Sequence, residues 1–335
     1  MTAVLPAAGL KATGGFDQHL QWGVDARREQ AFWLCQQWVG RPLQGGITRD
    51  ISLAILDRRT REISFLHDSE QAGGISNRIW QQGGDWRRLQ HNWPSGSFAS
   101  EQDGAGRGRL FTSLGQGDWQ LGEPADGSLA NQLTWPLGGM RWQVGVRSGQ
   151  MRCGGQSVTG DFRTASVQRW GRISMPGMAF IQSLQLDNER DDQFTAHGLM
   201  VAPALAIREP VTAAVGSLRW RGGVLDFDRW WPSPTLDAAR LDRYRWMGTL
   251  AGPTHRLDIV ADGDNPRVTP WLALNERQPD GHRRLLRVTP FARLHLRLFA
   301  RGSQDLLQEW RTDTCLLMTA QPGETLRSGV VQAAP

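Results

Sequence analysis

The sequence predicts a mainly β protein made of two antiparallel β-barrels or half-barrels packed together, with one or two short helices. Three observations predict this fold class. Apolar and polar residues alternate with a period of two through most of the chain, which is typical of half-buried strands. The 39 glycines and 17 prolines separate these segments as turns, and 335 residues with 39% hydrophobic content are enough for two ordinary domains. Barrels are expected because closure removes exposed strand edges.

Two segments favour helices instead. Residues 24–39, VDARREQAFWLCQQWV, place Ala31, Leu34 and Trp38 at helical spacing, and Asp25 can serve as the N-cap. A second, short helix is expected over residues 236–246, LDAARLDRYRW. A boundary near residues 165–185 gives an N-terminal barrel-like domain of residues 1–170, which holds the early helix, and a C-terminal barrel domain of residues 171–335.

The other segments predict hairpins. Residues 51–68 form one that turns at Asp57 to Thr60, and residues 140–155 form another that turns at Ser148-Gly149. Asp280-Gly281 marks a further turn. After it, alternation puts Leu294, Leu296 and Leu298 on one face and Arg293, His295 and Arg297 on the other. Residues 133–146 and 217–230 share a Trp and Gly-Gly pattern, but no clear internal repeat emerges.

The stretch GSLRWRGGVLDFDRWWP, residues 216–232, predicts a hairpin in a definite register with a two-residue turn at Gly222-Gly223. This register pairs Trp220 with Leu225, Leu218 with Phe227, Arg219 with Asp226, and Ser217 with Asp228. The first two pairs form a packed face. Asp226 is then more an ion-pair partner than a catalyst, whereas Asp228 has no cationic residue opposite it. Asp228 is therefore the candidate carboxylate.

Charge and cysteine content exclude several classes of protein. Lys11 is the only lysine among 38 basic residues, the net charge is only +5, and the arginines occur singly or in pairs, so a nucleic-acid-binding arm is not indicated. The three cysteines are far apart and outside any CxxC, which argues against disulfides and a cysteine-ligated metal and fits a reducing compartment. The N-terminus is a poor signal peptide, and no apolar stretch reaches about 18 residues.

Several short motifs carry no chemistry. The glycine-rich residues 104–108 lack the strand–turn–helix context of a dinucleotide site. Residues 187–192, DNERDD, read as a solvated acidic loop, with a divalent-cation site as the alternative. The seven histidines show no metal-ligand spacing. His197 and His255 each lie at the edge of an apolar strand, where a structural histidine is favoured over a general acid or base.

The order of motifs in the C-terminal half resembles the tandem lipocalin-like (calycin) group, which includes tocopherol cyclase and the carotenoid hydratases. The resemblance rests on a Gly-x-Leu-x-Trp-x-Gly-Gly hairpin at 216–223, Arg245-Trp246, and a Gly-x-x-His-x-Leu-x-Ile strand at 252–259, followed by the segments PWLAL and TPFARLHLRL. It implies two lipocalin-like β-barrels with an apolar pocket. Enzymes of this kind fold a polyene or prenyl chain and protonate or align it, often without a cofactor. No catalytic residue carries over position by position.

Tryptophan is the strongest anomaly of composition, with 16 residues against one tyrosine. Most must fill a β core, but an indole-lined barrel also suits a flat, apolar polyene or ring-bearing ligand. The candidate substrate-binding residues are Trp220, Trp230, Trp231, Trp246 and Trp271. A carboxylic acid among tryptophans is desolvated, which raises its pKa toward that of a proton donor. The candidate catalytic residues are therefore Asp228, although Arg229 beside it works against that shift, and His255 as an alternate acid or base.

The leading hypothesis is an enzyme: a cofactor-independent cyclase, isomerase or hydratase acting on a hydrophobic isoprenoid or polyene-like molecule in a tryptophan-lined pocket. The alternative is a binding, carrier or assembly protein for a pigment or lipid, which holds the same ligand and forms no product. A third interpretation is a carbohydrate-binding or hydrolytic protein, because exposed tryptophans also stack on sugars. No cofactor and no metal are expected. The expected partner is the hydrophobic ligand, not nucleic acid, and the expected location is cytoplasmic, with peripheral membrane contact left open.

Overall fold

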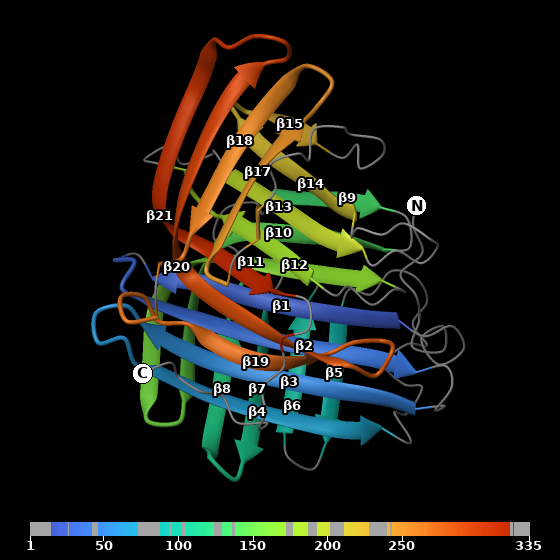
Figure 1. Ribbon diagram of the computed structural model, residues 1–335. Coiled ribbons are helices and arrows are strands. Elements are labelled where there is room, and N and C mark those ends of the chain that lie inside the picture. The colour runs from blue at the N-terminus through green and yellow to red at the C-terminus, as the bar shows by residue number, and fades with distance from the viewer. Residues whose placement is uncertain are drawn as a thin grey trace. The chain divides into compact units, whose positions relative to one another are not determined.

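The computed structural model (Figure 1) describes residues 15–25, 27–41, 46–72, 88–93, 96–101, 105–123, 129–135, 138–171, 177–186, 193–201, 211–227, 240–241, 243–264, 266–321 and 324. The chain divides into two compact units. The N-terminal unit comprises Met1–Gln132, Pro136–Ser174 and Arg277–His282, and the C-terminal unit comprises Leu133–Trp135, Met175–Glu276 and Arg283–Pro335. Each unit contains one large antiparallel sheet.

The N-terminal sheet has eleven strands: β1 (Gly15–Asp25), β2 (Gln30–Arg41), β3 (Gly46–Asp57), β4 (Ile63–Ala72), β5 (Arg88–Trp93), β6 (Gly96–Glu101), β7 (Gly106–Thr112), β8 (Gly115–Leu121), β9 (Leu129–Trp135), β10 (Gly138–Cys153) and β11 (Gln156–Gly171). Their order is β4-β3-β2-β1-β11-β10-β8-β7-β6-β5, and β9 pairs with β10 beside this path. The sheet curls into a half-barrel, because Leu53 of β3 lies against Gly117 of β8 and its carbonyl accepts a hydrogen bond from Cys153 at 3.4 Å.

The C-terminal sheet has ten strands: β12 (Gly177–Ser183), β13 (Gln193–Val201), β14 (Val211–Trp220), β15 (Gly223–Phe227), β16 (Arg240–Leu241), β17 (Arg245–Ala251), β18 (His255–Asp262), β19 (Leu272–Arg277), β20 (Arg283–Ala300) and β21 (Leu306–Ala320). Their order is β15-β14-β13-β12-β21-β20-β18-β17-β16, and β19 pairs with β20. This sheet also curls on itself: Gly216 of β14 lies under Leu250 of β17, and Gly252 lies against Phe227 of β15.

The two sheets follow one plan that the sequence did not reveal. In each, the first four strands are consecutive neighbours, the first strand pairs with the last (β1 with β11, β12 with β21), and the last pairs with the strand before it. The strand before these two, β9 or β19, lies off the main path in both units. Residues 133–146 and 217–230 share a Trp and Gly-Gly pattern. Their described positions occupy β9–β10 and β14–β15, so the two segments are not equivalent.

The helix predicted over residues 24–39 is wrong. β1 runs to Asp25 and β2 begins at Gln30, and the Asp25 carboxylate accepts hydrogen bonds from the backbone N–H groups of Glu29 at 2.9 Å and Gln30 at 3.3 Å. Asp25 thus stabilises a tight turn between strands. Residues 31–40 are all buried because β2 lies between β1 and β3 with both faces covered. Such a strand shows no period-two alternation, and its apolar residues can match a helical spacing by chance.

No residue in the described ranges is helical, so the expectation of short helices is not met. Of the second predicted helix, residues 236–239 and 242 lie outside the described residues. Residues 240–241 form β16, and β17 already begins at Arg245. The predicted helix is therefore wrong at its C-terminal end, where Arg240 and Leu241 pair with Met247 and Trp246.

Two hairpin predictions are confirmed and one is wrong. The turn at Asp57 to Thr60 joins β3 to β4, and the turn at Asp280-Gly281 joins β19 to β20. Ser148-Gly149, by contrast, lies inside β10, which turns into β11 only at Gly154-Gly155. A Cβ at Gly149 would lie 2.7 Å from the Gln120 carbonyl oxygen. This glycine therefore permits the close approach of β8 rather than forming a turn.

The β14–β15 hairpin exists, but its predicted register is wrong. The turn residues are Arg221 (φ 50°) and Gly222 (φ 75°), not Gly222-Gly223. The observed pairs are Gly216 with Phe227, Ser217 with Asp226, Leu218 with Leu225, Arg219 with Val224, and Trp220 with Gly223. Each residue of β14 pairs with a residue of β15 that lies two positions earlier than predicted. The same side chains therefore stay on each face of the hairpin, but Arg219 and Asp226 are no longer directly opposite each other.

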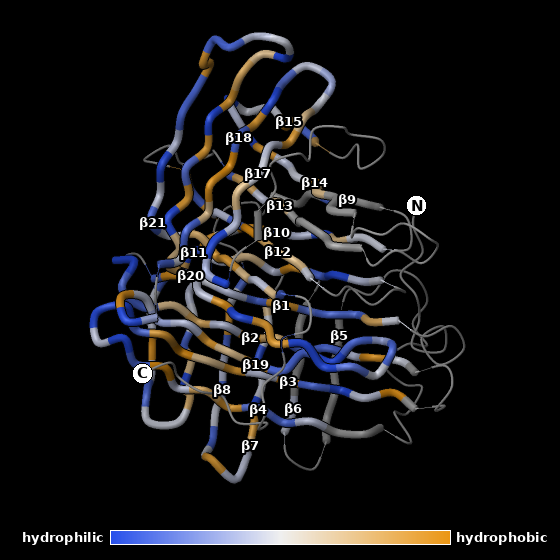
Figure 2. The backbone as a smooth tube through the Cα atoms, in the orientation of Figure 1, coloured by the Kyte–Doolittle hydropathy of each residue, from blue (hydrophilic) through white to orange (hydrophobic). Residues whose placement is uncertain are grey.

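The alternation predicted along β20 is confirmed. Leu294, Leu296 and Leu298 are buried in the core of the C-terminal unit, and the intervening Arg293 and Arg297 are exposed. Figure 2 shows the same alternation of hydrophobic and hydrophilic positions along β18 and β21. The interior of the C-terminal half-barrel is therefore lined largely by aliphatic and aromatic side chains.

Candidate functional site

The residues predicted for the C-terminal site are partly brought together. The Trp220 ring forms T-shaped contacts with the rings of His255, at a centroid distance of 6.2 Å, and Trp310, at 6.4 Å. Nδ1 of His255 hydrogen-bonds with the Thr254 hydroxyl at 2.8 Å. Among the described residues, His255 has no carboxylate within ion-pair distance. Asp228, Trp230 and Trp231 lie outside the described residues.

The other two predicted tryptophans are core residues. Trp246 is 2% exposed and lies over Gly248, where a Cβ would approach its ring to 2.8 Å. Trp271 is 3% exposed, and its indole N–H donates to the Gly263 carbonyl at 3.0 Å. Both rings fill the half-barrel where glycine gives them room. Their role in binding a substrate stays a prediction.

The N-terminal half-barrel contains a second set of polar residues, which the sequence analysis did not single out. β1 is a central strand with β2 and β11 on its two sides, and Figure 2 shows several hydrophilic positions along it. Asp17, His19 and Gln21 alternate on one face of β1, and directly opposite them on β2 lie Trp38, Gln36 and Leu34. Trp38 and Leu34 belong to the core of this unit, so this face is the interior.

The centre of the set is a carboxylate facing an imidazole. Nε2 of His19 lies 3.4 Å from Oδ1 of Asp17, whose side chain is 3% exposed, while that of His19 is 12% exposed. Gln168 of β11, directly opposite His19, donates its amide N–H to both oxygens of Asp17 at 3.0 and 3.2 Å. The carboxylate is thus held by one side chain and presented to another, the arrangement that orients a general acid or base.

Aromatic and charged residues border this pair. The rings of His19 and Trp38 meet edge to face at 5.4 Å and 87°. Arg49 lies directly opposite Trp38 on β3, is fully buried, and has its NH2 atom 3.6 Å from Oδ2 of Asp68. A buried guanidinium next to a carboxylate keeps this end of the interior close to electrical neutrality.

Gln36 lies beside the pair and is fully buried. It is directly opposite His19, and neither its amide nitrogen nor its amide oxygen has a hydrogen-bond partner within the protein. Polar atoms buried in a protein interior are nearly always hydrogen-bonded, so this side chain calls for an explanation.

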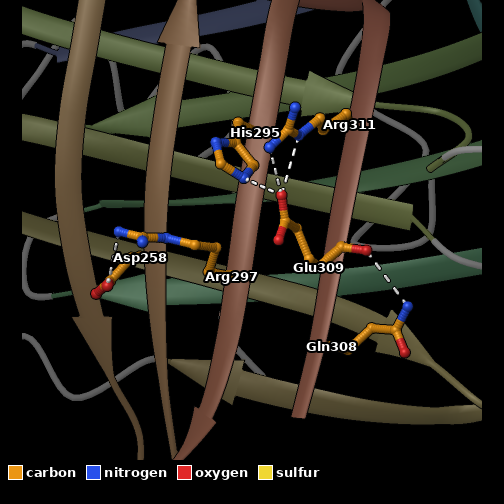
Figure 3. Close-up of polar contacts among 6 residues, drawn as sticks. All are labelled: Asp258, His295, Arg297, Gln308, Glu309 and Arg311. Carbon is orange, nitrogen blue, oxygen red and sulfur yellow. Dashed lines mark hydrogen bonds and ion pairs between the residues drawn. The ribbon is translucent and has the colours of Figure 1, made fainter. Parts of the chain in front are cut away.

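The outer face of the C-terminal sheet carries a ladder of charges rather than a site. Glu309 accepts hydrogen bonds from His295 at 2.8 Å and from Arg311 at 2.7 Å, and Arg297 lies 3.5 Å from Asp258 (Figure 3). These side chains are 24% to 74% exposed. The Arg311 and His295 hydrogen bonds lower the pKa of Glu309. Ion pairs that are this exposed to solvent contribute little to stability and do not form an enclosed site for catalysis.

No group of three or more His, Cys, Asp or Glu side chains is placed to hold a metal ion within the described ranges. In the same part of the chain, no helix has the length and apolar character required to cross a membrane.

Comparisons with known proteins identify the fold. No protein-family model matches the sequence, and none of the curated proteins matches it. Solved structures do match: an AttH-type protein from Nitrosomonas europaea has a TM-score of 0.53 with 12% identity over 92% of each chain. CghA has a TM-score of 0.53 with 11% identity over 94% of this chain and 90% of its own.

Kievitone hydratase from Nectria haematococca has a TM-score of 0.47 with 10% identity over 96% of this chain and 94% of its own. The first two likenesses extend over almost the whole of both chains. The tandem lipocalin-like fold expected from the sequence is therefore confirmed, with a half-barrel in each unit.

A sequence signal for the N-terminal site does exist. In GFDQHLQWGVD, polar residues occupy alternate positions 17, 19 and 21, which on its own indicates a strand with one solvated face. Only the pairing of β1 with strands on both sides, and the burial of both its faces, turns that polar face inward.

Proposed function

We propose that the protein is an acid–base enzyme of the cyclase, isomerase or hydratase type, acting on a hydrophobic isoprenoid or polyene-like molecule without a redox cofactor. One observation carries this proposal: the Asp17 carboxylate, held by Gln168, faces the His19 imidazole inside the N-terminal half-barrel, next to an apolar cluster that includes Trp38 and Leu34. An apolar interior alone supports binding, whereas an oriented carboxylate–imidazole pair supports proton transfer.

Under this proposal each group has a role. A carboxylate at Nε2 favours the tautomer with the proton on that nitrogen, so Nδ1 is the basic atom of His19. Nδ1 takes a proton from a carbon next to an activating group of the substrate, and Asp17 stabilises the imidazolium that forms. Returning the proton to another carbon completes an isomerisation. In a cyclisation, the deprotonated carbon first bonds to an electrophilic double-bond carbon of the same molecule, and the proton then goes to the carbon that carries the negative charge. In a hydration, Nδ1 instead takes a proton from a water whose oxygen bonds to one carbon of an activated double bond, and the imidazolium returns that proton to the other carbon.

The surroundings support an apolar substrate. Trp38 is in edge contact with His19, and Ile51 and Leu34 lie on the same interior face, so aromatic and aliphatic side chains lie near the pair. A water-poor interior also strengthens the electrostatic interaction between Asp17 and a protonated His19.

The test compares one histidine from each unit. Wild-type protein, His19→Gln and His255→Gln are incubated with isoprenoid and polyene compounds, and products are identified by mass spectrometry, since isomers conserve mass and hydration adds one water. We expect His19→Gln to lower kcat about 100-fold or more, with circular dichroism unchanged, and His255→Gln to retain most activity. Asp17→Asn should act as His19→Gln does.

Other outcomes would assign the function elsewhere. Loss of turnover in His255→Gln or Asp228→Asn with full activity in His19→Gln would place the chemistry in the C-terminal unit. Recovery of a tightly bound, unchanged ligand from wild-type protein, with no product from any compound, would favour the carrier alternative for a pigment or lipid.

A further inference from the structure

Two neighbouring glutamines of β2 differ sharply in their hydrogen bonding. Gln37 points to the opposite face of the sheet from Gln36, and its amide N–H donates to the Arg277 carbonyl at 2.9 Å. Gln36 is 0% exposed, and both its amide nitrogen and its amide oxygen lack a partner within the protein. The same side chain type is thus satisfied at one position and unsatisfied at the next.

An unsatisfied buried amide destabilises a folded protein, because it has lost its hydrogen bonds to water without replacing them. Leucine has a similar size and no such cost, so a side chain kept only for packing would be better apolar. A buried group that costs stability is explained when its partner is a molecule that binds there. Gln36 is opposite His19 and on the same face as Trp38, so that partner would lie beside the Asp17–His19 pair.

We propose that Gln36 binds the polar head group of the substrate, and that this group is uncharged and carries a donor and an acceptor side by side, as a primary amide or a protonated carboxylic acid does. This inference rests on the proposed function for the location of the substrate. The amide oxygen of Gln36 accepts the N–H or O–H of the head group, and its amide nitrogen donates to the carbonyl. Two such hydrogen bonds fix the orientation of the ligand relative to His19.

The surrounding charges favour a neutral head group over an anion. Asp17 is directly opposite Trp38, and Asp68 is directly opposite Ile51, on the interior face that Gln36 also occupies. Arg49 is already paired with Asp68 at 3.6 Å. An anionic head group would lose its hydration and meet carboxylates nearby, whereas a neutral one loses less on transfer from water.

The experiment uses two probes that share one isoprenoid chain: the primary amide of farnesoic acid, and farnesene, which has no polar head. Binding to the full-length protein is followed by quenching of tryptophan fluorescence, and stability by thermal unfolding without ligand. The variants are Gln36→Leu and, as the matched control on the same strand, Gln37→Leu.

We expect wild-type protein to bind the amide about 10-fold or more tightly than the hydrocarbon, since two hydrogen bonds are gained. Gln36→Leu should abolish this preference and raise Tm, because the unsatisfied amide is gone. Gln37→Leu should keep the preference and lower Tm, because its hydrogen bond to Arg277 is lost.

Three results would overturn the inference: equal binding of both probes by wild-type protein, binding of neither, or an unchanged preference in Gln36→Leu. Because binding is read without turnover, these results are independent of the kinetic test on His19. A preserved head-group preference with no effect of His19→Gln on catalysis would refute the proposed chemistry and leave the role of Gln36 intact.

Discussion

Asp57 shows how one side chain stabilises a turn. Its carboxylate accepts hydrogen bonds from the Thr60 backbone N–H at 2.8 Å and from the Gln30 side-chain amide at 2.9 Å. Burial by itself raises the pKa of Asp57, but the hydrogen bonds from Thr60 and Gln30 outweigh it and lower the pKa below 3.8. The charged form is therefore the one that the folded protein favours.

This arrangement predicts an acid-dependent contribution to stability. Because the folded-state pKa is lower than the unfolded value of 3.8, the contribution is fully present above that pH and is lost as the pH falls through the folded-state pKa. Asp57→Ala should reduce the free energy of unfolding by about 2 kcal/mol at pH 7, and the difference from wild type should shrink toward pH 3. Urea unfolding at both pH values measures it, and an Asp57→Ala difference that stays constant across this range would contradict the assignment.

The site residues divide by how they could be found. His255 and Trp220 were each predicted as residues of the C-terminal site, and the structure brings their ring centroids to 6.2 Å. Asp17 and His19 were not predicted, because polar residues at alternate strand positions usually face water. Gln36 was not predicted, because it lies in the segment for which a helix was expected. The contact that defines this site joins residue 17 to residue 168, and no local pattern reports a pairing across 151 positions.

At the scale of elements, β2 and the β14–β15 hairpin show where local patterns fail. β2 is buried on both faces, so its sequence lacks alternation and matches a helix. In the hairpin, two adjacent glycines gave two choices of turn, and the structure uses Arg221-Gly222 with positive φ at both residues. Leu218 and Phe227 pack into the core in the predicted register and in the observed one, because a shift of two residues leaves the same side chains pointing inward. Core packing alone therefore does not distinguish the two registers.

Glycine at the hairpin turn is a testable requirement. Gly222 has φ +75° with open space around its Cβ position, so only backbone strain opposes a side chain there. Gly222→Ala should lower the free energy of unfolding by about 1 kcal/mol. Gly155 is the control, since its Cβ position is also open and its φ is not in the left-handed region. Gly155→Ala should therefore be near neutral in chemical denaturation, and equal effects of the two substitutions would refute the explanation.

At the scale of the whole molecule, the same strand order recurs in two units without a visible sequence repeat. The half-barrel fold requires apolar residues at the inward positions and glycine where large side chains pack closely against the backbone, but it does not require particular residues at most positions. Trp119 over Gly108 in the N-terminal unit and Trp246 over Gly248 in the C-terminal unit are such solutions. Topology can therefore persist while the identities of the residues diverge.

The three cysteines report on the integrity of both units. Cys35 and Cys153 lie in the N-terminal unit and Cys315 in the C-terminal unit, and all are buried. Burial raises the pKa of Cys153 to about 12 and also raises that of Cys315. We expect no thiol to react with a chromogenic disulfide reagent in native protein at pH 8, and all three to react after denaturation.

Partial denaturation extends this measurement. If the units unfold separately as denaturant is increased, the thiols should become reactive in two steps, one of two thiols and one of a single thiol. The reason is that two cysteines lie in one unit and one in the other. Rapid labelling of any cysteine under native conditions would show that the strand bearing it is not packed as described.

The sequence by itself determined the β character of the chain, the turns at Asp57–Thr60 and Asp280-Gly281, and the inward and outward faces of β20, because each follows from interactions among residues close together in the chain. The tertiary structure decided the strand identity of β2, the register of β14–β15, and the meeting of Asp17, His19 and Gln168. Those features depend on which distant strands become neighbours, and burial on both faces of a sheet removes the alternation from which neighbours could be inferred.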